Sequence, residues 1–415
     1  METGAHALHH HAPERSLRRG LLHGLSALVV LAGLVLAALP ARAQVFDSNA
    51  PFAFLYDLDT ETVLYAHDAD APFAPASLTK LMTAEIVFGF LDENAVSEET
   101  LFRVTEDTWR RGGAPAGTAT MFAEVNSDVS VGDLLSGLVV QLANDAALTL
   151  ADGFDGSEEA FARRMTARAS ELGLTQTRFT NATGFPEPEG ATTTVRDMVR
   201  LAIHVIRTRR EHYGRFSAPD FTWNGIFQRN RNPIIGEIAG ADGLMIGGTD
   251  DAGYGIVGSV EREGRRIVFA LAGLDTPEAR VTEAARIVEH AFNDFRTVLV
   301  AARGEPITEV RVHGGAQRYV GVVAEDRDLH ILLPREGVER VRARVVYDSP
   351  VPAPVVAGQP IGRLVVERDG LIIQETRLVA ASDVPVGPLT ARARDGLTEL
   401  LFGWIPPISF AGDLQ

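Results

Sequence analysis

Residues 75–80 read PASLTK and place Ser77 three positions before Lys80, the only lysine in the chain. The chain carries 39 Lys and Arg residues, so every other one of these cations is an arginine. Arginine stays charged at any working pH, whereas a buried lysine can lose its proton and act as a base. The S-x-x-K pattern therefore predicts a serine nucleophile with a lysine base beside it. Chance retention of one lysine at this spacing is the alternative.

The segment after Ser77 has the pattern of a buried helix. Apolar side chains recur there at helical spacing, at Leu78, Leu81, Met82, Ile86 and Phe90, which predicts a helix that begins at or just after Ser77. Ser77 would then lie at the helix N-terminus, where backbone N–H groups and the helix dipole favour negative charge. Lys80 would follow one turn later on the same face.

The rest of the chain divides into a part with helices and strands and an all-β part. In the first part, strands are expected at 52–57, 62–66, 254–260 and 266–272, and helices at 131–142, 144–152, 158–172, 194–207 and 278–291. Glu263 and Gly264 are expected to form the turn of a hairpin. After about residue 305, short strands alternate with turns, at 309–312, 320–323, 330–333, 341–346, 361–367 and 371–379, which predicts a sandwich or barrel.

Composition excludes several classes of protein. The hydrophobic content of 46% is that of a chain with a real core, and the net charge of -16 argues against a nucleic-acid partner. The absence of cysteine excludes disulfides and thiol chemistry. The histidine-rich start, residues 6–11, resembles a metal-binding tract but precedes the predicted cleavage site. The later histidines show no metal-ligand spacing and no phosphate-binding loop is present, so neither a metal nor a cofactor is expected.

The N-terminus reads as an export signal. Arg15, Arg18 and Arg19 precede an apolar stretch from 21 to 39, and the small-x-small sequence 41–43 follows as a cleavage site. Removal of residues 1–43 would leave a mature, periplasmic chain. An uncleaved membrane anchor is the alternative, because the apolar stretch is nearly long enough to span a bilayer.

The C-terminal tail, residues 385–415, is predicted to form an amphipathic helix. Its apolar face comprises Leu397, Leu400, Leu401 and Trp404. This face would either pack on the β-module or lie in the outer surface of the inner membrane, for which a terminal tryptophan is typical.

Several motifs, in order, resemble those of a known family. They are PASLTKLMT at 75–83, Gln141 with NDA at 144–146, NATG at 181–184, NRNP at 230–233, DGL at 242–244, Gly247, and TDDAGY at 249–254. The family is that of the serine D-alanyl-D-alanine carboxypeptidases, low-molecular-weight penicillin-binding proteins of the penicillin-binding protein 5 type. The resemblance covers nearly the whole mature chain.

This resemblance implies both a fold and a reaction. The implied fold is the α/β (α+β) transpeptidase fold of penicillin-binding proteins and β-lactamases, an antiparallel sheet flanked by helices, at 44–304, with a small all-β domain at 305–384. Ser77 would attack the terminal peptide bond of a peptidoglycan stem peptide or a β-lactam, and Lys80 would take its proton. Asn144 completes the catalytic residues. Backbone N–H groups of Ser77 and Gly248 would form the oxyanion hole, and Arg231 and Gly247 would contact substrate.

Two family motifs are altered in this chain. The S-x-N motif reads Leu142-Ala143-Asn144, which removes a hydroxyl proton relay, an effect on the order of 10²–10⁴ in rate. The Lys-Thr-Gly motif reads Met245-Ile246-Gly247, which removes a cation and a hydroxyl that would hold the substrate carboxylate. Without that cation, Lys80 is expected to be harder to deprotonate. The apolar replacements indicate a dry, filled groove.

Two functions remain open. The first is a serine D-Ala-D-Ala carboxypeptidase, impaired or altered in specificity, and the second is a catalytically defective paralogue that binds peptidoglycan or a cell-wall partner. A serine β-lactamase is a third and weaker option, because no glutamate is evident for deacylation. Asp242 and Asp250, which flank the third motif, are expected to have structural roles.

Overall fold

The computed structural model describes residues 46–186, 190–390, 392 and 393. The predicted signal sequence and the predicted amphipathic tail helix lie outside these residues. Among the helices that the structure does describe, none is long and apolar enough to cross a bilayer.

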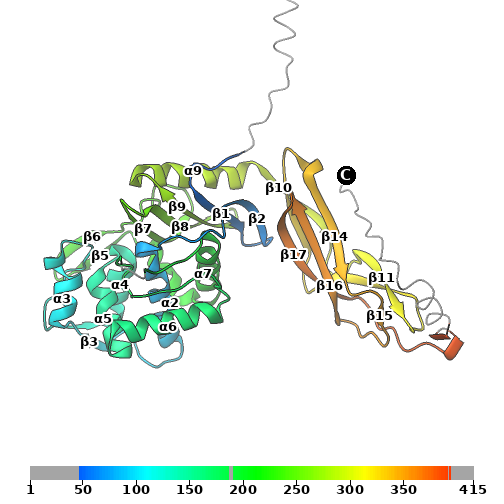
Figure 1. Ribbon diagram of the computed structural model, residues 1–415, viewed down its shortest axis with the longest axis horizontal. Helices are drawn as coiled ribbons and strands as arrows, with labels where there is room; N and C mark the ends of the chain where they lie inside the picture. Colours follow the sequence, from blue (N-terminus) through cyan, green and yellow to red (C-terminus); the bar gives the residue numbers. More distant parts are fainter. Residues whose placement is uncertain (1–45, 187–189, 391, 394–415) are drawn as a thin grey trace, which may run out of the picture. The chain divides into compact units, whose positions relative to one another are not determined.

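The first part of the chain is built on a five-stranded antiparallel sheet (Figure 1). Its strand order is β2-β1-β9-β8-β7, with bounds Thr62–His67, Phe52–Asp57, Arg265–Leu274, Gly253–Arg262 and Ala241–Thr249. Helices cover the central strands: α9 (Pro277–Asn293) packs on β8 and β9, and α7 (Val195–Thr208) packs on β9 and β1. The middle of β9 is therefore a continuous buried apolar run, which is typical of strands that are covered on both faces.

The remaining helices surround α2 (Lys80–Asp92), which follows the short 3-10 turn η1 (Ala76–Thr79). Every residue of α2 from Lys80 to Phe88 is buried, so this helix forms the centre of the core. The helices around it are α4 (Val131–Gln141), α5 (Asn144–Asp155) and α6 (Glu158–Glu171), together with α7.

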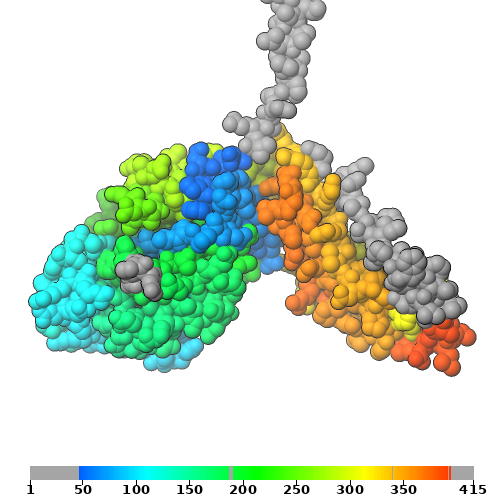
Figure 2. All heavy atoms as spheres, in the orientation of Figure 1, coloured from blue at the N-terminus to red at the C-terminus, as the bar shows by residue number. Residues whose placement is uncertain are grey.

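Shorter elements complete this part. They are α3 (Glu106–Gly112), α8 (Arg210–Tyr213), the pair β3 (Leu101–Arg103) and β4 (Asp128–Ser130), and the hairpin β5 (Asp220–Trp223) and β6 (Ile226–Arg229). The cyan surface that includes α3 lies at one end of this part in the space-filling view (Figure 2).

The β-module is a six-stranded sheet with a two-stranded neighbour. The larger sheet has the order β14-β16-β17-β12-β11-β15, with bounds Val341–Tyr347, Pro360–Arg368, Leu371–Ala380, Tyr319–Ala324, Thr308–His313 and Val351–Pro352. Strands β10 (Phe295–Ala301) and β13 (Leu329–Pro334) form the smaller sheet. All six strands expected here from sequence are present, and β10 and β15 are additional.

The sequence predictions for the first part also agree with the structure. Each predicted helix and strand is found, with ends that differ by three residues or fewer. The hairpin turn is confirmed at Glu263 and Gly264, both of which have positive φ. The antiparallel sheet flanked by helices and the all-β module are therefore the expected fold class.

Candidate active site

Ser77 and Lys80 meet at the junction of η1 and α2. Ser77 lies in the 3-10 turn, and Lys80 is the first residue of the α-helix. The Lys80 ammonium nitrogen Nζ lies 3.2 Å from Ser77 Oγ and donates a 2.6 Å hydrogen bond to the carbonyl oxygen of Thr183. Lys80 is fully buried, whereas Ser77 is partly exposed. A hydroxyl open to ligand thus has a buried amine beside it.

Burial determines the protonation of Lys80. The pKa of Lys80 is lowered to about 7: loss of hydration is the largest cause, the nearby Arg231 guanidinium also lowers it, and Glu158 opposes both effects. The second-motif and third-motif changes therefore do not leave Lys80 fully protonated at neutral pH. Desolvation is the largest cause of the lowered pKa, so the cation missing from the third motif is not needed to bring the pKa of Lys80 to about 7.

The altered second motif lies between α4 and α5. Leu142 caps α4 in the left-handed conformation and is 7% exposed. Asn144 begins α5, and its Nδ2 donates to Thr118 Oγ1 at 3.0 Å. Its Oδ1 is buried and has no hydrogen-bond partner among the described residues. The amide nitrogen of Asn144 is therefore held by Thr118, and its amide oxygen remains available as a hydrogen-bond acceptor.

The loop that carries Thr118 is fixed by Asp145. This buried carboxylate accepts hydrogen bonds from Thr120 Oγ1 and from the backbone N–H groups of Met121 and Ala123. Burial raises the pKa of Asp145, and these hydrogen bonds oppose the rise. Asp145 thus holds the loop against the second motif.

The altered third motif lies on β7, the edge strand of the sheet. Met245 is completely buried and Ile246 is 8% exposed, so the replacements are packed rather than open to solvent. A Cβ added at Gly247 would lie 2.8 Å from the backbone nitrogen of Leu78. Only glycine permits this approach of β7 to the turn that carries the nucleophile.

Two arginines lie near the third motif or the base. Arg231 is exposed; its Nε donates to Gln141 Oε1 at 3.1 Å, and it acts on Lys80 through its charge. Arg280 of α9 is buried, and its Nη1 lies 3.4 Å from the carbonyl oxygen of Gly247. Its Nε has no partner among the described residues, and burial lowers its pKa.

The two aspartates that flank the third motif have separate partners. Asp242 accepts hydrogen bonds from the Tyr213 hydroxyl at 2.8 Å and from Arg266 at 2.7 Å. Asp250 accepts one from the Tyr254 hydroxyl at 2.6 Å. These contacts agree with the structural roles expected from sequence. No group of three or more acidic or histidine side chains that could hold a metal occurs in the described part of the chain.

Four residues of this region had no role predicted from sequence: Thr118, Glu158, Arg280 and Thr183, the last of which lies in the NATG motif at 181–184. Thr118 and Thr183 act through a contact to Asn144 and through a backbone carbonyl, neither of which has a sequence signature. Arg280 and Glu158 are single charges on amphipathic helices, and only their burial sets them apart.

Comparison with known proteins identifies the family of the chain. The family model for D-alanyl-D-alanine carboxypeptidase matches residues 40–276, and the model for the C-terminal domain of penicillin-binding protein 5 matches residues 295–386. DacA of Haemophilus influenzae is 32% identical over 80% of this chain and 84% of its own length. DacC of Escherichia coli is 31% identical over 94% and 97%, respectively.

Solved structures show the same relationship. The crystal structure of penicillin-binding protein 5 from H. influenzae is 31% identical and has a TM-score of 0.70, covering 83% of this chain and 99% of that chain. Penicillin-binding protein D2 from Listeria monocytogenes, solved in its ampicillin-bound form, is 31% identical with a TM-score of 0.54, covering 60% and 100%. The chain therefore belongs to the family of serine D-alanyl-D-alanine carboxypeptidases that act on peptidoglycan, and it carries a C-terminal domain of the penicillin-binding protein 5 type.

Proposed function

We propose that this protein is a serine D-Ala-D-Ala carboxypeptidase that trims peptidoglycan stem peptides through an acyl-enzyme on Ser77. The observation that carries the proposal is the contact of Ser77 Oγ with the fully buried Lys80, whose pKa of about 7 leaves a substantial neutral fraction at neutral pH. A neutral amine can accept the hydroxyl proton, whereas an ammonium cannot.

In the proposed reaction, Ser77 Oγ attacks the carbonyl carbon of the terminal peptide bond while Lys80 takes its proton. The tetrahedral oxyanion is bound by the backbone N–H groups of Ser77 and Gly248, which do not depend on side-chain identity. The proton then passes to the departing D-Ala amine, and water hydrolyses the ester on Ser77. Asn144 and Arg231 would hold the substrate amide and carboxylate.

The proposed location is the periplasm. Residues 1–43 would be an export signal, the catalytic domain would end before β10 and not at residue 304, the β-domain would run from β10 to residue 384, and the tail 385–415 would contact the outer face of the inner membrane. Peptidoglycan, the polymer on which the family acts, lies in that compartment.

Labelling with a fluorescent penicillin tests the nucleophile. The mature chain is expected to form a covalent adduct, because a β-lactam is opened by the same attack of Ser77 Oγ. Ser77→Ala is expected to remove the labelling without affecting the fold, since Ser77 is partly exposed. Absence of label on folded wild-type protein would contradict the proposal.

A second function is favoured by Leu142, Met245 and Ile246, three buried apolar residues at family polar positions. They support a catalytically defective paralogue that binds peptidoglycan or a cell-wall protein without turnover.

Restoring the family residues distinguishes the two functions. The triple variant Leu142→Ser, Met245→Lys, Ile246→Thr is expected to release D-Ala from a muropeptide at least about 10²-fold faster than wild type. The reason is that it returns a proton relay and two carboxylate contacts to an otherwise complete nucleophile and base. Release of D-Ala by the folded wild type above the level of Ser77→Ala would support the carboxypeptidase, whereas release by the triple variant alone would favour the binding function.

A further inference from the structure

The loop that binds Lys80 is itself held from two sides. The N–H of Ala182 donates to Glu158 Oε1 at 3.1 Å, and its carbonyl accepts from Thr83 Oγ1 of α2 at 2.8 Å. The next carbonyl along the chain, that of Thr183, accepts the 2.6 Å hydrogen bond from Lys80 Nζ. The N–H that binds Glu158 and the carbonyl that binds Lys80 therefore belong to adjacent residues, Ala182 and Thr183.

The same loop also contacts the turn that carries the nucleophile. A Cβ added at Gly184, where φ is +81°, would lie 1.8 Å from the carbonyl oxygen of Ala76. Because the loop and the Ser77 turn touch without a side chain between them, a shift of the loop moves both reacting groups.

Contacts from α3 and α6 determine the position of the Glu158 carboxylate. It is the first residue of α6, its side chain is 6% exposed, and it forms an ion pair with Arg111 near the end of α3. A buried carboxylate with a single charged partner is costly unless its remaining oxygen is also hydrogen-bonded. Here that oxygen takes the N–H of Ala182, so both carboxylate oxygens are in use.

Glu158 is also the acid that acts on the base. The charges that act on Lys80 are Arg231, which favours the neutral amine, and Glu158, which favours the ammonium. Two other buried acids of the helical part are engaged elsewhere: Asp145 of α5 holds the loop around Thr120, and Glu85 of α2 binds Arg168 and Arg209.

We propose that Glu158, held by Arg111, is a positioning residue of the acyl-transfer site. Its carboxylate fixes the loop whose Thr183 carbonyl binds Lys80, and its negative charge opposes that of Arg231 at the base. This inference rests on the proposed roles of Ser77 and Lys80, and the test below does not require turnover.

The single lysine makes a direct test possible. Labelling with lysine enriched in ¹³C at Cε gives one side-chain signal, from Lys80, whose chemical shift reports its protonation as pH is varied. In Glu158→Gln the titration midpoint is expected to fall by roughly half a unit to one unit, because a negative charge is lost while the acceptor for Ala182 N–H is kept. In Arg111→Gln it is expected to rise, because Glu158 then acts on Lys80 without its counter-charge.

Matched neighbours supply the controls. Glu159→Gln and Arg110→Gln remove exposed charges from the same two helices and are expected to leave the midpoint unchanged. Midpoints that stay at the wild-type value in both test variants, or that move in the same direction, would overturn the inference.

The rate of acylation by fluorescent penicillin distinguishes the effect of Glu158 on the loop from the effect of its charge on Lys80. Glu158→Gln should keep the plateau rate of acylation above the acid limb and move that limb to lower pH, whereas Glu158→Ala should lower the plateau rate because the loop loses its anchor. If Glu158→Ala does not fold, the titration midpoint of Glu158→Gln still tests whether Glu158 acts on Lys80. A wild-type protein that takes up no penicillin but shows the two opposite midpoint shifts would refute the proposed function and leave the role of Glu158 intact.

Discussion

Lys80→Arg is expected to lower the rate of Ser77 acylation by roughly 10²–10⁴-fold, although the variant keeps a positive charge beside the hydroxyl. The buried amine of Lys80 has a pKa of about 7, so a large fraction is neutral at neutral pH and can accept a proton. A guanidinium stays protonated and can only donate. The measurement is the pseudo-first-order rate of penicillin labelling.

The pH dependence of the acylation rate is a second test of Lys80 as the base. Lys80 is neutral above its pKa, so wild-type acylation should rise with pH through about 7 and then level off. This limb should be absent in Lys80→Arg, whatever residual rate remains. A variant that acylates at the wild-type rate with the wild-type profile would show that another group is the base.

Lys80→Met separates loss of function from loss of fold. Between the folded pKa and the higher unfolded one, the unfolded chain binds more protons, so at neutral pH the buried amine reduces stability. Methionine has similar length and no charge to bury, and its variant should be inactive yet more stable than wild type in denaturant unfolding. An inactive, destabilised Met variant would mean that packing around Lys80 also matters.

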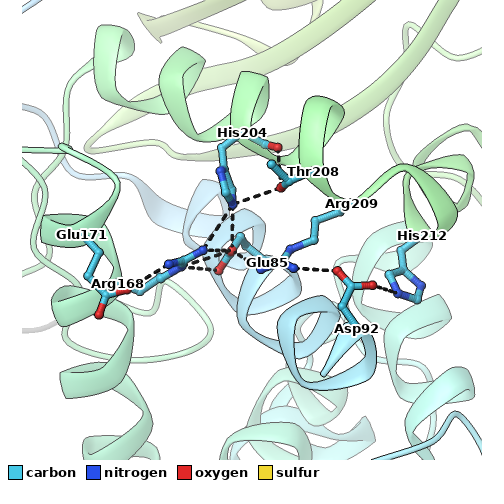
Figure 3. A network of polar contacts seen from close by, with 8 residues as sticks. All are labelled: Glu85, Asp92, Arg168, Glu171, His204, Thr208, Arg209 and His212. Carbon is cyan, nitrogen blue, oxygen red and sulfur yellow. Dashed lines mark hydrogen bonds and ion pairs between the residues drawn. The ribbon is translucent and has the colours of Figure 1, made fainter. Parts of the chain in front are cut away.

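Glu85→Gln is expected to lower the free energy of unfolding by about 3–5 kcal/mol, because it removes a buried carboxylate that two half-buried arginines share. Glu85 of α2 is 1% exposed and contacts Arg168 at 3.0 Å, Arg209 at 2.8 Å and His204 at 3.1 Å (Figure 3). These residues come from α6, from α7 and from the residue that follows α7, so the cluster ties the central helix to its neighbours. Denaturant unfolding measures the loss.

A matched control lies in the same cluster. Glu171 also contacts Arg168, at 2.9 Å, but its side chain is 64% exposed, so Glu171→Gln should cost only about 0–1 kcal/mol. Equal losses for the two variants would mean that burial does not determine the strength of these contacts.

Acid should remove the contribution of Glu85. Burial by itself raises the pKa of this carboxyl, but hydrogen bonds from His204, Arg168 and Arg209 prevail and lower it to about 2 from an ordinary 4.5. A depressed carboxyl pKa stabilises the fold above the unfolded pKa, and the effect is lost as pH falls from about 4.5 towards 2. The stability difference between wild type and Glu85→Gln should shrink over that window.

Periodicity predicted the long elements because each covers a continuous core. Helices α4 to α7 and strands β8 and β9 bury whole faces, and such faces leave a strong pattern in sequence. Strands β3 to β6 have only three or four residues each, and β15 has two. Strands β3, β4 and β15 pair with distant segments, so local pattern does not determine them, whereas β5 and β6 form a local hairpin around Asn224 and Gly225.

The sequence predicted the reacting groups better than their surroundings. Ser77 and Lys80 are neighbours along one helical turn, so their spacing already brings them together. The pKa of Lys80 depends instead on burial and on Glu158 and Arg231, which lie far away in the sequence. Only the packing of α2 against α6 and the Thr183 loop makes those charges relevant to the base.

The burial of the sole lysine has a further consequence for limited proteolysis. An endoprotease specific for lysine has one target in the whole chain, the bond between Lys80 and Leu81, in the first turn of the central helix where both residues are fully buried. The native fold protects this bond, and cleavage requires the helix to open locally or the domain to unfold. Such a protease would cut the opened chain into two fragments, so the rate of that single cut measures how often the core around the proposed base is breached.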